Sequence, residues 1–93
     1  MAHSSRTQAF LVESRIAQAA DGDVRALYEL GIAYSTGSGG TPIDLVEAHK
    51  WFNLAAMRGN QEAKKFRSEL AAEMTALQVA EAQRQAREWL ATH

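Results

Sequence analysis

Apolar and small residues recur at three- and four-residue steps along most of the chain, which is the period of an α-helix and not the alternation of a strand. The clearest stretch runs from residue 22 to residue 59, and a glycine-rich break at residues 37–40 divides it. Its small and aromatic members are Ala26, Tyr28, Leu30, Gly31, Tyr34, Ala48, Trp51, Phe52, Ala55 and Ala56. We predict a helix over about residues 23–35 and a second over about 43–58. Alanine and glycine at their seam let the two backbones approach closely.

The same period predicts three further helices. Residues 7–20 place Ala9, Val12, Ile16 and Ala19 on one stripe, broadened by Phe10. After residue 59, Asn60 opens a helix that extends to about Met74, and a last helix follows from Val79 after a short break at residues 75–78. Pro42 suits an early helix position, because its missing amide costs nothing there. Residues 1–6 are polar, and we expect them to be disordered.

The stretch from Gly22 to Gly59 also resembles a known family, the Sel-1-like repeat, a helical hairpin related to the tetratricopeptide repeat. The residues that carry the resemblance are Gly22, Ala26, Tyr28, Leu30, Gly31, Tyr34, Gly37, Gly39, Asp44, Ala48, Trp51, Phe52, Ala55, Ala56 and Gly59. The loop from Tyr34 to Asp44 is one residue longer than the family uses, with Gly40 and Thr41 where an apolar valine is common.

Traces of repetition extend beyond this hairpin. Gly22 recurs as Gly59 after 37 residues, and the Ala19–Ala20 pair recurs as Ala55–Ala56 after 36. In the next unit, Lys65, Arg67 and Ser68 replace apolar or small residues, which gives a final repeat the polar outer face that it needs. We therefore predict an all-α fold, a short right-handed α-solenoid of about five helices. A single domain over residues 7–93 would hold a half-repeat helix, a well-matched hairpin at 22–59 and a degenerate capping hairpin at 60–91.

Composition narrows the functional classes. The 93 residues are 46% apolar and 23% charged, as in an ordinary globular domain, and the formal net charge is −1. The N-terminal half is mildly acidic and the C-terminal half mildly basic, but glutamates dilute the basic residues and no aromatic residues are interleaved with them. These residues are Lys64, Lys65, Arg67, Arg84 and Arg87. We expect no nucleic-acid binding. Without a signal peptide or a membrane-spanning run, we expect a cytoplasmic protein that does not insert into membranes.

Residues with catalytic or ligating chemistry do not converge in the sequence. There is no cysteine, and His3, His49 and His93 are too scattered for a zinc pair. We expect His3 and His93 at frayed ends and His49 as a partly exposed structural residue. Glu69 and Glu73 are one helical turn apart but too few to hold calcium or magnesium, and the glycine-rich loop follows a helix instead of a strand. We expect no enzyme, cofactor or metal.

The resemblance instead implies a protein–protein interaction module, an adaptor or scaffold that binds a peptide or protein segment in a groove of rigid helices. The helical phase of residues 23–35 exposes Arg25, Glu29 and Ile32, which we predict as the partner-binding residues. The alternative is a self-assembling structural protein, such as a homodimer formed through the N-terminal helix or the Trp89 end. Trp89 itself either seals the core or presents an exposed apolar spot.

Overall fold

The computed structural model describes residues 5–93, with side chains from Leu11 onward. It contains five α-helices: α1 (Ser5–Ala20), α2 (Val24–Thr36), α3 (Leu45–Met57), α4 (Gln61–Glu73) and α5 (Ala76–Thr92). A short 3-10 turn, η1 (Ser38–Gly40), lies between α2 and α3. No strand occurs within the described residues, which confirms the prediction of an all-helical fold with five helices.

The N-terminal expectations are only partly open to comparison. Helix α1 begins at Ser5, two residues before the predicted start. We expected residues 1–6 to be disordered, but residues 1–4 of this segment lie outside the described part of the chain. The side chains of Ala9 and Phe10 also lie outside it.

Side-chain caps set where four of the helices begin. The side chain of Asp23 accepts hydrogen bonds from the first amides of α2, while Asp44, Asn60 and Thr75 do the same for α3, α4 and α5. Because Asp44 is the cap, Pro42 lies in the loop before α3 and not at an early helix position as predicted. Thr75 and Gln78 form a reciprocal capping box. That box starts α5 at Ala76, so the predicted break at residues 75–78 was too long.

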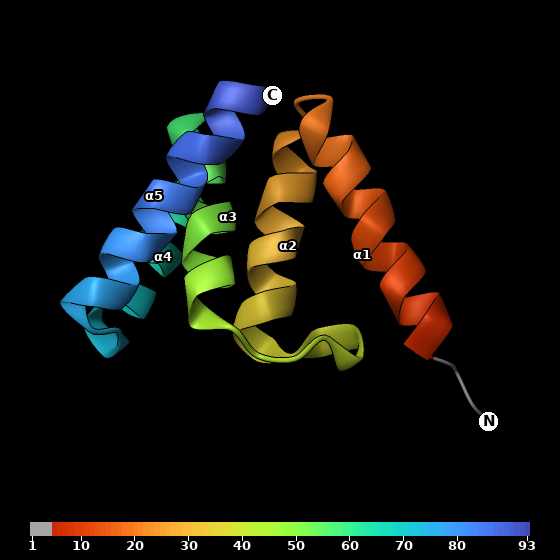
Figure 1. Cartoon of the computed structure of the whole chain (residues 1–93), viewed down its shortest axis with the longest axis horizontal. Coiled ribbons are helices and arrows are strands. Elements are labelled where there is room, and N and C mark those ends of the chain that lie inside the picture. The colour runs from red at the N-terminus through yellow and green to blue at the C-terminus, as the bar shows by residue number, and fades with distance from the viewer. Residues whose placement is uncertain (1–4) are drawn as a thin grey trace.

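Helix α3 is the centre of the packing (Figure 1). It packs against α2, α4 and α5, whereas α1 packs chiefly against α2. In Figure 1, α1 and α5 lie at opposite sides of the molecule, with α2 and α3 between them and α4 behind. The extents of the described chain are 40 × 28 × 22 Å. This order of consecutive antiparallel helices is consistent with a short α-solenoid.

The core forms where α2 and α3 meet. The Phe52 ring lies 5.9 Å from the Tyr28 ring and 5.5 Å from the Phe66 ring, measured between centroids, so this cluster joins α2, α3 and α4. A Cβ atom built on Gly31 would lie 2.5 Å from Phe52 Cδ1. Only glycine therefore allows the ring to approach the α2 backbone this closely, as predicted for the seam. The fully covered residues around it include Leu27, Leu30, Ala48, Leu54, Ala55 and Ala63.

The loop between α2 and α3 closes through backbone contacts. Gly37 ends α2 in the left-handed conformation, with φ of 73°, and its amide donates to the Ala33 carbonyl. At the other end of the loop, the Asp44 amide donates to the Tyr34 carbonyl over 2.9 Å. These contacts hold the two ends of the loop together, so the hairpin stays closed.

Candidate interaction surfaces

The predicted partner-binding residues lie on α2, but they are not equally exposed. The Arg25 side chain is 83% exposed, and that of Glu29 is 35% exposed. Ile32 is half-buried and packs against the core, so it presents only part of its side chain. The structure therefore places two charged residues and the edge of one apolar residue on this surface.

Glu29 joins two arginines on this surface. Arg25 Nε lies 3.2 Å from Glu29 Oε2, and Arg15 Nε, from α1, lies 3.6 Å from Glu29 Oε1. One carboxylate thus faces two guanidinium groups. On the other side of α2, the Tyr28 hydroxyl donates to Glu62 of α4 over 3.3 Å. Burial, and next the Glu62 carboxylate, raise the pKa of Tyr28.

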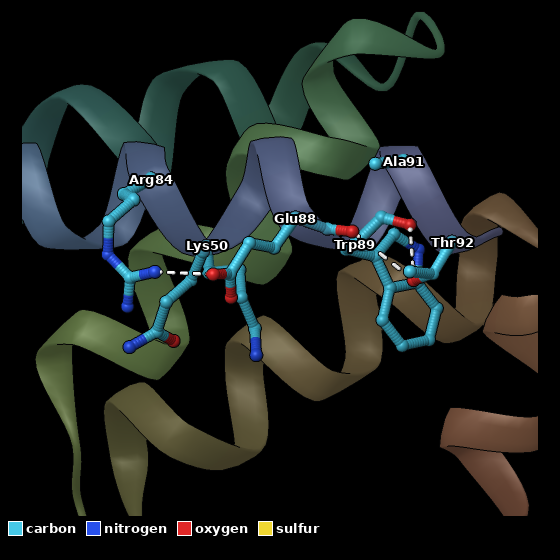
Figure 2. Close-up of a pocket in the computed structure, with 7 residues that line it drawn as sticks. Lys50, Arg84, Glu88, Trp89, Ala91 and Thr92 are labelled. Carbon is cyan, nitrogen blue, oxygen red and sulfur yellow. Dashed lines mark hydrogen bonds and ion pairs between the residues drawn. The ribbon is translucent and has the colours of Figure 1, made fainter.

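A second surface is a hollow of about 600 Å³ between α3 and α5 (Figure 2). Lys50 reaches it from α3, and the other residues that line it come from α5: Arg84, Gln85, Glu88, Trp89, Ala91 and Thr92. Sequence reasoning singled out only Trp89 and Arg84 from this set, and it did not bring them together. No local pattern marks the hollow, because it exists only where α5 crosses α3.

Trp89 lies at one end of the hollow. Its ring meets that of Trp51 edge to face, with centroids 4.8 Å apart, and it packs against the core. Trp89 therefore seals the core, which is the first of the two alternatives given by the sequence. On its other side the His93 ring is stacked, with centroids 3.6 Å apart and planes 12° apart. His93 is therefore held against α5, whereas we had expected it to lie at a frayed end.

Ion pairs border the hollow. Arg84 Nη2 lies 2.6 Å from Glu81 Oε2, and Arg84 Nη1 lies 2.5 Å from Glu88 Oε2. Hydrogen bonds from Arg84, and then from Gln85, lower the pKa of Glu81 to about 2. On α3, Lys50 Nζ lies 3.2 Å from Glu47 Oε1 and 4.5 Å from the centroid of the Trp51 ring.

His49 is the clearest departure from expectation. It is 3% exposed instead of partly exposed, and its Nδ1 atom is buried without a hydrogen-bond partner. Burial, and next the charge of Arg67, lower the pKa of His49. Arg67 is half-buried and donates to Asn53 over 2.8 Å, so it joins α4 to α3 instead of contributing to a solvated outer face.

Comparison with known protein families identifies a repeat in one segment of the chain. Residues 24–60 match the sequence model of the Sel1 repeat. Over these residues the chain is similar to the Sel1 repeat family. Searches of curated proteins and of solved structures gave no match. The Sel1 repeat begins where α2 begins and ends at Asn60, the cap of α4, so it coincides with the α2–α3 hairpin.

The Sel1 repeat indicates a general class of function but no specific partner. Sel1 repeats are generally protein–protein interaction modules, and proteins that carry them are typically non-catalytic. The predicted residues Arg25, Glu29 and Ile32 all lie within the matched segment. The hollow lies mostly outside it, because only Lys50 comes from the matched residues.

Two further properties concern the described residues alone. Among the side chains that the structure describes, from Leu11 to His93, no group of three or more ligating residues gathers to hold a metal ion. None of the helices described there has the length and apolar character that a membrane crossing needs.

Proposed function

We propose that this chain is a non-catalytic adaptor or scaffold that binds a peptide or protein segment along α2. The observation that carries the proposal is the arrangement of Arg25, Arg15 and Glu29. Two guanidinium groups share one carboxylate, so hydrogen-bond donors are left to bind an acceptor on a partner. The Sel1 repeat supports a role in protein interaction.

The support beneath these side chains is rigid. Asp23 caps α2 and Gly37 ends it, while Leu27 and Leu30 on its inner side are fully buried. A partner that binds along α2 would therefore meet residues that need little reordering, which lowers the entropic cost of association. The half-buried Ile32 adds a small apolar contact to a mostly polar surface.

The test is a cross-linked pull-down from an extract of the native cells, with retained proteins identified by mass spectrometry. We expect Arg25→Glu to lose a partner that the wild-type chain retains, by about tenfold or more, because the substitution reverses the most exposed charge. Arg87→Glu is the matched control, since it makes the same charge change on the exposed side of α5. Both variants should keep the circular dichroism spectrum of the wild type.

The result that would overturn this proposal is a partner retained equally by the wild type and Arg25→Glu. If only further copies of the chain are recovered, self-assembly into a homodimer takes its place. Light scattering at two protein concentrations then measures the oligomeric state directly.

A further inference from the structure

His49 is buried on the side of α3 that α4 covers. It lies one helical turn before Asn53, so the two side chains share a face of α3. Arg67 of α4 donates to Asn53 over 2.8 Å, so this face is the one against which α4 packs. His49 is 3% exposed, and no described protein group forms a hydrogen bond with its Nδ1 atom. A titratable group thus lies inside the seam between two helices, and the proposed adaptor function does not use it.

This seam suits only the neutral form of the His49 ring. Both nitrogens of a charged imidazole are donors, so the N–H at Nδ1 would be buried without an acceptor. A charged ring would also add a second positive charge to a seam that already holds the half-buried Arg67. Burial, and next the charge of Arg67, accordingly lower the pKa of His49.

Among the described side chains, no carboxylate compensates for a charge on His49. The charged residues of α4 other than Arg67 are exposed, namely Glu62, Lys64, Lys65, Glu69 and Glu73. The carboxylates of the other helices packed against α3 are engaged elsewhere: Glu29 with Arg15 and Arg25, and Glu81 and Glu88 with Arg84, while Arg87 is exposed. On α3 itself, Glu47 pairs with Lys50. A proton on His49 therefore meets Arg67 and no group of opposite charge.

Helix α4 is held less firmly than the two helices beneath it. Of its residues, all of which the structure describes, Ala63 alone is fully buried, while Phe66 and Leu70 are half-buried against the core. Helix α5 packs against α3 and does not clamp α4 in place. By contrast, α3 has six buried residues: Ala48, His49, Trp51, Phe52, Leu54 and Ala55. Separating α4 from α3 therefore exposes the His49 ring at a lower cost than unfolding the α2–α3 hairpin.

We propose that acidification releases α4 from α3 through protonation of His49, while the α2–α3 hairpin stays folded. At neutral pH the uncharged ring is compatible with the closed seam. A charged ring is favoured only where water can reach it, so protonation shifts the population toward the open form. Opening uncovers the side of Phe52 that the Phe66 ring covers, with centroids 5.5 Å apart. This device lies on other helices than Arg25 and does not depend on the proposed adaptor function.

The test is amide hydrogen exchange of the full chain, followed by nuclear magnetic resonance at pH 7.5 and pH 5.5 and corrected for the intrinsic effect of pH on exchange. We expect the opening constant of the α4 amides to rise by up to about tenfold at pH 5.5, because an exposed histidine with a pKa of about 6.5 gains that factor one pH unit lower. Low concentrations of urea should change this opening less than they change the opening of α3, since local opening exposes less surface than global unfolding.

Variants show whether His49 causes the rise. His49→Leu should abolish it, because leucine has no proton to bind. His93→Ala is the matched control: it removes an exposed histidine of α5 and should retain the full rise.

The proposal is overturned if the opening constant of the α4 amides does not rise at pH 5.5, or if the rise persists in His49→Leu. It is also overturned if the amides of α3 and α4 share one opening constant and one urea dependence, because the chain then opens only as a whole. The first and third of these results come from the wild-type chain, so a poorly folded variant does not leave the proposal untested.

Discussion

At the scale of single residues, His49 shows how the interior of a small helical domain changes the chemistry of a side chain. It is the buried polar residue of α3, and no described protein group forms a hydrogen bond with its Nδ1 atom. Charging this ring would bury an ion beside the positive charge of Arg67. The neutral form is therefore favoured in the folded state.

We predict that stability falls as the pH is lowered through the range of His49. The pKa of His49 in the folded chain lies below its ordinary value of 6.5. The unfolded state therefore binds the proton first, and the contribution of His49 is fully present above about pH 6.5. It declines as the pH falls toward the lower folded-state pKa. Urea denaturation between pH 7.5 and pH 5.5 measures this loss as a falling free energy of unfolding.

Substitution isolates the effect of His49. His49→Leu should flatten the dependence over this pH interval, because an apolar residue of similar size has no proton to bind. His93→Ala should retain it, since His93 is exposed at the end of α5. An unchanged pH dependence in His49→Leu would show that other groups cause the loss.

At the scale of helices, the close approach of α2 and α3 depends on one missing methyl group. Gly31 lies opposite the Phe52 ring, and the ring is fixed between Tyr28 and Phe66. The ring has no open side toward which it can move. Backbone separation at this seam is thus set by a contact between a glycine and an aromatic face.

We predict that Gly31→Ala lowers the free energy of unfolding by about 1–2 kcal/mol. Overpacking of this kind costs about 1–3 kcal/mol, and the better helix propensity of alanine returns up to about 1 kcal/mol. Denaturation in urea at pH 7.5 gives the difference. In a Phe52→Leu background, the same substitution should cost clearly less, because the smaller side chain leaves room for the methyl group. Stabilisation by Gly31→Ala in the wild-type background would contradict the tight seam.

At the scale of the whole molecule, the helices differ in how many neighbours support them. Helix α3 contacts α2, α4 and α5, whereas α1 depends chiefly on α2. Opening α1 exposes one seam, but opening α3 disrupts the Phe52 cluster and the Trp51–Trp89 contact together. Stability in such an array is distributed by nearest-neighbour contacts.

We therefore predict that amide hydrogen exchange is slowest in α3 and fastest among the helices in α1. Amides buried at the middle of the array should exchange only through global unfolding, and those of α1 through local opening. Exchange followed by mass spectrometry or nuclear magnetic resonance at pH 7 gives the order. Equal protection of α1 and α3 would indicate that the chain unfolds as one cooperative unit.

The hairpin was predictable because its signals are local. Small and aromatic residues at helical spacing marked α2 and α3, and the glycine-rich break marked the loop between them. The starts of α3 and α5 were less predictable. We expected these helices to begin near Pro42 and Val79, but they begin directly after the caps Asp44 and Thr75. A side chain that accepts an amide hydrogen bond fixes the start of a helix more firmly than an apolar stripe does.

Candidate surfaces were harder to predict than the helices. The helical phase correctly put Arg25 on the outside, but it did not reveal that Arg15 of α1 shares the Glu29 carboxylate. The hollow on α5 gave no sequence signal, because Lys50 and Glu88 come from α3 and α5, which are separated in the chain by α4.

The sequence by itself determined the helical class, the number of helices and the Sel1 repeat, because periodicity, caps and glycine turns act over a few residues. Only the tertiary structure decided that His49 is buried, that Arg67 bonds to Asn53 and that His93 stacks on Trp89. The physical reason is that burial and charge partners depend on which helix covers each face. Which helix covers a face is decided by packing between helices that are distant in the sequence, so it cannot be read from the sequence of one helix.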